Sequence, residues 1–168
     1  MLVGLPVERQ GGPTMGEALQ RRIETERIEN PVQEALLNLL VAADHVRQRV
    51  NRACAAHGLT IGQYNVLRIL RGAPQGHPRS EILRRMVEQA PDVTRLVDRL
   101  EARGLVERDR SAKDRRLSIT RITPQGLELL QKVDPDIANF HAWFQSRVPL
   151  PDCQEISRIC EELYGASA

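Results

Sequence analysis

The chain has 168 residues, three cysteines and a formal net charge of +2 at neutral pH. This length suits one domain with extensions and allows a sizeable hydrophobic core. We expect neither a membrane protein nor a secreted one, because no apolar run approaches the roughly 20 residues of a spanning helix and no basic N-terminus precedes an apolar stretch. Cys54, Cys153 and Cys160 form an odd set without C-x-x-C spacing, which favours a reducing, cytoplasmic location over a disulfide scaffold.

Positive charge is concentrated in the middle of the chain. Residues 60–123 contain 14 Lys and Arg against 8 Asp and Glu, a local charge of +6, whereas the remainder contains 10 against 14, a local charge of −4. A solvated surface without a partner gives no reason for such a split. The asymmetry therefore favours an anionic partner for this segment, and nucleic acid above all.

The first third of the chain is predicted to form a mobile arm followed by helices. Residues 1–16 contain four glycines and two prolines without a helical period, which predicts the arm. Residues 17–28 predict a short, highly charged helix. An Asn-Pro pair at 30–31 then begins a long helix, which Gly58 closes. A helix this long with one apolar face needs a partner, either its own domain or a second copy of the chain.

Two shorter helices are expected next. Thr60 is a predicted N-cap, followed by apolar positions from Ile61 to Leu70. Residues 72–78 break the pattern with two prolines. Residues 80–86 then predict another short helix.

The stretch that follows has a two-sided pattern. Val93, Leu96, Val97 and Leu100 recur at i, i+3, i+4 and i+7, which marks one buried helix face. The opposite face carries the polar residues Asp92, Thr94, Arg95, Asp98 and Arg99. Gly104 supplies the left-handed residue with which such helices end.

Two strands and a charged loop are predicted beyond Gly104. Residues 105–108 and 117–122 have strand character, and the loop 109–116 between them holds four cations. A short helix, a turn, a helix with a polar face and a basic hairpin together predict a winged helix-turn-helix domain over residues 59–123. This shape fits duplex DNA.

Two runs within this domain resemble the MarR family of transcriptional regulators. Residues 93–108 read VTRLVDRLEARGLVER, which is similar to the recognition helix of the family, and DRR at 114–116 followed by ITPQG at 122–126 resembles its wing signature and next helix start. The turn before the recognition helix departs from the family pattern, because Val87 stands where glycine is expected and residues 89–90 stand where a Ser or Asp cap is common.

The C-terminal part, residues 124–168, predicts further helices. The first should be kinked or interrupted at Pro135, residues 148–151 form a break, and the last helix should end near Gly165. The resemblance implies dimerisation through both ends of the chain, residues 17–58 and 124–168. The expected fold is therefore mainly α, with a small two- or three-stranded β-wing, the winged domain being flanked by N- and C-terminal dimerisation helices.

The predicted DNA contacts come from the polar helix face and the basic loop. Arginine suits bidentate contacts to guanine or phosphate, and Thr94 can contact a phosphate or a thymine methyl group. Two roles are open for Asp92. Its carboxylate could accept a hydrogen bond from a cytosine amino group, or it could stabilise the start of the helix, and the second role is favoured. The full predicted set is Asp92, Thr94, Arg95, Arg99, Arg110, Lys113, Arg115 and Arg116. The alternative for these side chains is ordinary solvation.

The resemblance also implies how the wing is oriented. It suggests that Asp114 orients an arginine and that Arg116 pairs with Asp98, which would tie the wing to the recognition helix. We expect Arg115 to contact DNA and Arg116 to be shared between DNA and Asp98.

Catalytic chemistry finds little support in the sequence. His45, His57, His77 and His141 show no metal-binding spacing, and neither a glycine-rich phosphate loop nor a G-x-S-x-G turn is present. We expect no catalytic site, metal or cofactor, the alternative being a regulatory metal held where histidines converge in a dimer. Cys54 and Cys160 fall on apolar helical faces, which favours buried structural roles over redox sensing.

The aromatic residues are concentrated in the C-terminal helices, at Phe140, Trp143, Phe144 and Tyr164. The resemblance implies an effector cavity between the dimerisation helices and the winged domain, often accepting aromatic or phenolic anions. A core or dimer-interface role is the other interpretation. Tyr64, Arg68 and Trp143 are the candidate ligand-binding residues.

These patterns predict a homodimeric, sequence-specific DNA-binding regulator, expected to act as a repressor on a pseudopalindromic operator. Its expected partners are double-stranded DNA, a second copy of the chain and a small aromatic or phenolic effector that releases it, without a membrane. The alternative is a winged-helix protein-interaction module that does not bind DNA. The basic loop and the Arg95 and Arg99 stripe argue against that alternative.

Overall fold

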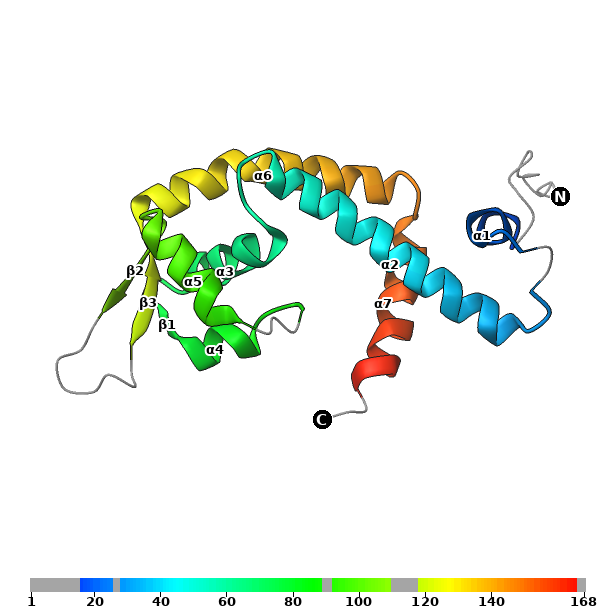
Figure 1. Ribbon diagram of the computed structural model, residues 1–168. Helices are drawn as coiled ribbons and strands as arrows, with labels where there is room; N and C mark the ends of the chain where they lie inside the picture. The colour runs from blue at the N-terminus through cyan, green and yellow to red at the C-terminus, as the bar shows by residue number, and fades with distance from the viewer. Residues whose placement is uncertain (1–15, 26–27, 89–91, 110–117, 166–168) are drawn as a thin grey trace, which may run out of the picture. The chain divides into compact units, whose positions relative to one another are not determined.

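A computed structural model describes residues 16–25, 28–88, 92–109 and 118–165 (Figure 1). Its helices are α1 (Glu17–Ile23), α2 (Pro31–Ala55), α3 (Ile61–Arg71), α4 (Arg79–Arg84), α5 (Val93–Ala102), α6 (Pro124–Gln145) and α7 (Leu150–Tyr164). Its strands are β1 (His77–Pro78), β2 (Val106–Asp109) and β3 (Ile119–Ile122). The expected fold, mainly α with a small β-wing, is confirmed. Within the described ranges, no helix is long and apolar enough to cross a membrane.

The chain divides into two compact units, residues 1–47 and 48–168, and the division falls within α2. In the described part of the first unit, Leu19 of α1 is buried. This helix ends at Ile23, because Glu24 adopts a left-handed conformation with φ of 53°. It is therefore shorter than the predicted helix over 17–28, while the predicted domain boundaries remain a prediction.

The side chains expected to begin two of the helices do so. Asn30 Oδ1 accepts a hydrogen bond from the Val32 amide at 2.9 Å at the start of α2. Thr60 and Gln63 form a reciprocal capping box at the start of α3, in which each side chain accepts from the other's backbone amide, at 3.2 and 3.0 Å. The predicted starts of the long helix and of the next one are confirmed.

The sheet has the order β1-β3-β2, and β3 is antiparallel to both neighbours. Strands β2 and β3 were predicted, whereas residues 72–78, which contain β1, were predicted only to break the helical pattern. Two residues carry no alternating pattern, and Pro78 favours a turn. Proline is tolerated at this position because β1 is an edge strand, which needs no hydrogen-bond donor on its outer side.

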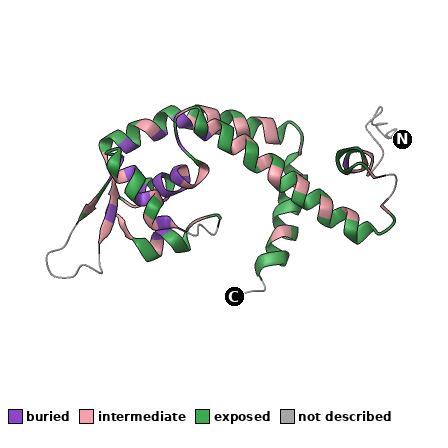
Figure 2. Ribbon diagram, in the orientation of Figure 1, coloured by how far each residue is buried: buried purple, intermediate pink, exposed green. Residues whose placement is uncertain are grey.

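The hydrophobic core of the second unit lies behind α5. Figure 2 shows buried residues gathered on α3, α5 and the first half of α6. Val93, Val97 and Leu100, the apolar face predicted for α5, are at most 4% exposed, and Leu96 packs at the edge. Burial of each such side chain contributes about 1.5–3 kcal/mol. The predicted buried face is therefore confirmed, and its burial turns the polar face of α5 outward.

One of the two cysteines expected in apolar surroundings belongs to this core. Cys54 is fully buried, and burial raises the pKa of its thiol to about 11. Cys160 of α7 is only partly buried. The expectation of burial is confirmed for Cys54, whose thiol stays neutral at physiological pH.

A backbone clasp joins the end of α5 to the start of α6. Gly104 is left-handed, with φ of 69°, as predicted. The Thr123 hydroxyl donates to the Gly104 carbonyl at 2.7 Å and accepts from the Gly126 amide at 3.1 Å. The Thr123 amide also donates to the Leu105 carbonyl at 3.1 Å. A Cβ on Gly126 would lie only 2.2 Å from that carbonyl oxygen, so the close approach requires glycine.

The sequence predicted a kink or an interruption at Pro135. Helix α6 continues through this residue, so the interruption is wrong and the kink remains a prediction. Proline removes one helical hydrogen bond, but the residues on both sides of it are held by side chains from outside α6. Arg71 donates from Nη1 to both Asp134 carboxylate oxygens, at 2.9 and 2.8 Å. His57 Nε2 lies 2.7 Å from Asp136 Oδ2. These contacts offset the lost bond and fix α6 against α3.

We expect the substitution Gly126→Ala to lower the free energy of unfolding by about 2 kcal/mol or more, the cost of forcing extra atoms into a packed site. The added methyl group must displace the Leu105 carbonyl and so loosen the junction between α5 and α6. Chemical denaturation followed by circular dichroism measures the effect. Gly165→Ala is the matched control, because nothing lies within 4 Å of its added Cβ. Equal stabilities of the two variants would contradict the requirement for glycine at residue 126.

Candidate nucleic-acid interface

Asp92 positions the start of α5. Its Oδ1 accepts from the Arg95 amide at 3.0 Å, which makes it the N-cap of the helix. The cap that the family pattern places at 89–90 is thus supplied two residues later. The favoured interpretation of Asp92, service at the helix start, is confirmed, and its proposed contact with cytosine remains a prediction.

The polar face of α5 is open to solvent. Arg95, Asp98 and Arg99 are exposed and Thr94 is partly exposed, opposite the buried face. The helix therefore presents a continuous polar surface of the predicted composition. Helices of this diameter fit the major groove of B-DNA.

The two arginines of this face differ in their neighbours. Arg95 Nε lies 2.9 Å from Asp92 Oδ2, an i,i+3 ion pair at the helix start. Arg99 makes no hydrogen bond or ion pair with any residue that the structure describes. The positive charge of the helix is therefore strongest at Arg99, a distinction that the sequence pattern alone did not make.

Arg108 ties β2 to the recognition helix. Its Nη2 donates to Asp98 Oδ1, and its Nε lies 3.5 Å from Glu101 Oε2. Asp98 was predicted to pair with Arg116, and Arg108 was not among the predicted residues. The structure links Asp98 to β2 through Arg108. The pairing with Arg116 remains a prediction.

The tip of the wing lies outside the described residues. This applies to Arg110, Lys113, Asp114, Arg115 and Arg116. Their assignments to DNA or to orienting the wing remain predictions. The flanking strands are described, and they hold Arg121 against Asp109 with 3.4 Å between Nη1 and Oδ2.

A further arginine, absent from the predicted set, reaches the recognition helix. Arg79, the first residue of α4, donates from Nη1 to Thr94 Oγ1 at 3.0 Å. The two residues are 15 positions apart, and their contact depends on how α4 packs against α5. The only sequence signal was an arginine directly after Pro78, where the helix begins.

The candidate ligand residues do not form one cluster. Tyr64 and Arg68 lie one turn apart on α3, and Arg68 donates to Asn65 at 2.8 Å. Burial raises the pKa of the Tyr64 hydroxyl. Trp143 lies on α6. It is nine residues beyond Asp134, which Arg71 of α3 binds, and nine residues span about 13 Å along a helix.

Trp143 itself is flanked by two guanidinium groups. The Cζ of Arg49 lies 3.8 Å from the ring centroid, and that of Arg147 lies 4.9 Å away. Phe140 stacks beside the indole, with 5.9 Å between ring centroids. An aromatic surface bordered by two cations suits a planar anion.

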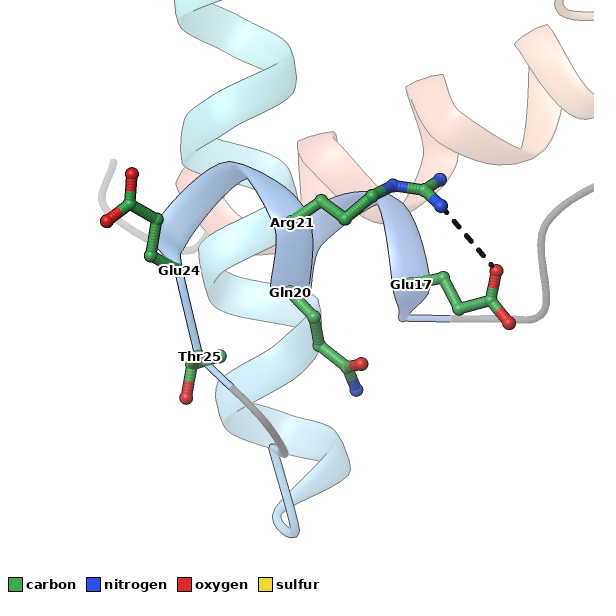
Figure 3. A pocket seen from close by; sticks show the side chains of 5 residues that line it. All are labelled: Glu17, Gln20, Arg21, Glu24 and Thr25. Atoms are coloured by element: carbon green, nitrogen blue, oxygen red, sulfur yellow. Dashed lines mark ion pairs between the residues drawn. The ribbon is translucent and has the colours of Figure 1, made fainter.

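A surface hollow of about 320 Å³ lies beside α1, far in sequence from these candidates (Figure 3). Glu17, Gln20, Arg21, Glu24 and Thr25 line it, and Arg21 pairs with Glu17 across 3.9 Å. Its exposed, mixed charges give no argument for a specific ligand. Across the described ranges, no group of three or more His, Cys, Asp or Glu side chains is placed to hold a metal ion.

Comparison with known proteins identifies the family. A model described as MarR family matches residues 57–117. The crystal structure of a MarR transcription factor from Planctomyces limnophilus is 32% identical, with 80% of this chain and 98% of that chain aligned at a TM-score of 0.63. The chain belongs to the MarR family. Its winged helix-turn-helix is therefore that of a DNA-binding transcriptional regulator.

Two further MarR-like proteins are similar to this regulator. The HTH-type transcriptional regulator MhqR of Bacillus subtilis (strain 168) is 30% identical over 95 residues, which are 56% of this chain and 62% of MhqR. CouR from Rhodococcus jostii RHA1, solved with p-coumaroyl-CoA bound, aligns with 81% of this chain and 95% of its own at a TM-score of 0.68 and 22% identity. At that identity CouR supports the fold alone. The matched proteins act in regulation rather than catalysis.

Substitutions at Asp92 should separate its two contacts. Asp92→Asn keeps a capping oxygen but removes the charge beside Arg95, so we expect nearly unchanged stability and tighter binding to mixed-sequence DNA. Asp92→Ala removes the cap as well and should cost about 1 kcal/mol of unfolding free energy. Thermal denaturation and fluorescence anisotropy with a labelled duplex measure the two effects. Asp152→Ala, in the first turn of α7 but away from the interface, is the control. Weaker DNA binding by Asp92→Asn would show that the carboxylate itself contacts DNA.

Proposed function

We propose that this MarR-family regulator is a homodimeric repressor that binds a pseudopalindromic operator with its two recognition helices. The observation that carries the proposal is the outward polar face of α5, whose apolar back is fixed in the core and whose Arg99 charge no described carboxylate neutralises. Such a rod can enter a major groove while its arginines reach base edges or phosphates. The wing cations Arg110, Lys113, Arg115 and Arg116 are proposed to add phosphate or minor-groove contacts.

Dimerisation is proposed through apolar helix faces that the single chain leaves uncovered. On α7, Ile156, Ile159 and Leu163 are 44–61% exposed, and this helix buries none of its residues (Figure 2). In the first unit, Val32, Leu36 and Leu40 of α2 are 56–67% exposed. MarR-family regulators act as dimers, and apolar faces of this extent are suited to a second copy. Two-fold symmetry then favours half-sites about one helical turn, roughly 34–36 Å, apart.

A small aromatic ligand is proposed to release the operator. Support comes from Trp143 between two guanidinium groups and from the p-coumaroyl-CoA bound to CouR. Tyr64 and Arg68 lie on α3, whereas Trp143 lies on α6, about 13 Å along that helix from the Asp134 that Arg71 holds. An elongated conjugate such as an aromatic acyl thioester is therefore proposed in preference to a lone phenolic acid. The ligand would shift the population toward dimers whose recognition helices no longer match the operator.

The operator proposal is tested with DNA taken from immediately upstream of the protein's own gene. We expect salt-sensitive protection of two half-sites in a footprint. Arg99→Ala should weaken operator binding by about 1–3 kcal/mol and relax the sequence preference, whereas Arg115→Ala should weaken binding to all duplexes alike.

The control for that experiment is Lys132→Ala, which removes an exposed cation of α6 outside the proposed interface. Its binding should match that of the unsubstituted protein. A folded protein that gives no salt-sensitive protection would count against operator binding and would favour a protein-interaction module. Equal effects of Arg99→Ala and Arg115→Ala on unrelated DNA would refute the division between specific and general contacts.

The ligand proposal is tested through Trp143, the only tryptophan of the chain. We expect p-coumaroyl-CoA to change its fluorescence and to weaken DNA binding by about five- to 150-fold, the usual range of allosteric coupling. Coenzyme A and free p-coumarate are the controls, and each should act more weakly than the conjugate. A fluorescence change without a change in DNA affinity would contradict release by this ligand.

A further inference from the structure

Arg79 lies where the wing sheet, α4 and the recognition helix meet. Pro78, directly before it, pairs with Ile119 of β3, which anchors the backbone to the sheet. The side chain is anchored at the other end, because Nη1 donates to Thr94 Oγ1 on α5 at 3.0 Å. An exposed arginine held at both ends has lost much of the rotamer freedom that binding would otherwise cost.

The charge of Arg79 is not balanced by a described carboxylate. Arg84 of α4 and Arg85, the residue after this helix, differ from Arg79, because Arg84 Nη2 and Arg85 Nε lie 2.7 and 2.5 Å from Glu81 Oε1 and so share one carboxylate. These contacts hold the pKa of Glu81 at about 2, so its charge persists throughout the physiological range. With Arg95 balanced by Asp92, Arg79 and Arg99 are the arginines of α4 and α5 that lack a described acidic partner.

These two cations flank the polar face of α5 from opposite edges. Thr94, which holds Arg79, and Arg99 are five residues apart, which places them about 140° apart around the helix. A helix in the major groove has a phosphate backbone on either side. Cations at the two edges are therefore suited to different strands of one duplex.

We propose that Arg79 is a phosphate contact of this regulator and that Thr94 is its positioning residue. This assignment rests on the proposed operator binding. One guanidinium N–H is used by Thr94, and the remaining ones can bind a phosphate oxygen, where a charge-assisted hydrogen bond is strong. Thr94 thereby acts through Arg79, a role different from the direct base or phosphate contact that its position in the sequence predicts.

The test compares Arg79→Ala with Arg84→Ala, its matched control on the same helix. Binding of a fluorescein-labelled, mixed-sequence duplex is titrated at several salt concentrations. Arg79→Ala should weaken binding about tenfold and lower the slope of affinity against salt by about one unit. Arg84→Ala removes a guanidinium that is already held by Glu81, and it should change both quantities much less. Unfolding curves verify that each variant is folded.

The role of Thr94 is tested by coupling. Thr94→Val should weaken binding through the loss of positioning, and should have little further effect once Arg79 is alanine. Independent, additive effects would show that Thr94 contacts DNA by itself and would overturn its positioning role. Equal effects of Arg79→Ala and Arg84→Ala would overturn the phosphate contact alone. Absence of salt-sensitive binding by the unsubstituted protein would overturn the proposed function as well.

Discussion

The close backbone contact between Leu105 and Gly126 is the constraint on which the winged domain of this protein depends. The chain leaves α5 at Gly104, pairs as β2 and β3, and returns to the same place at Thr123. Thr123 joins the two ends of this segment with three hydrogen bonds. The absence of a side chain at Gly126 lets the backbone there approach the Leu105 carbonyl. The recognition helix, the wing and α6 thus share one fixed junction, to which the side-chain contacts of Arg108 and Arg71 add.

The second organising principle is the local balance of charge. Arginines crowd the interface, yet many of them are held by nearby carboxylates: Arg95 by Asp92, Arg108 by Asp98 and Glu101, Arg84 and Arg85 by Glu81. A surface pair contributes little stability, but it determines where uncompensated charge remains. Among the described arginines of α4 and α5, Arg79 and Arg99 lack a described acidic partner, and they lie at the two edges of α5.

Periodicity and capping chemistry in the sequence were sufficient for much of the fold. The i, i+3, i+4, i+7 pattern predicted the buried face of α5, and Asn30, Thr60 and Gly104 marked helix ends, because each signal acts within one or two helical turns. The missed features depend on tertiary packing. The contact of Arg79 with Thr94 requires the docking of α4 on α5, and the contact of Arg108 with Asp98 depends on which side of β2 faces the helix. Strand β1 has only two residues and exists because β3 offers it a partner.

Helix α6 gives a mechanical consequence. Asp134 and Asp136, on either side of Pro135, are held by Arg71 of α3 and by His57 of the turn after α2, and Leu130 and Val133 are buried in the core. The first half of α6 therefore moves with the winged domain as one rigid body. The proline removes the main-chain bond that would otherwise stiffen the rod at this point. The side-chain contacts of Asp134 and Asp136 offset this loss, so a displacement of α6 near Trp143 is passed on to the winged domain instead of being lost as bending at Pro135.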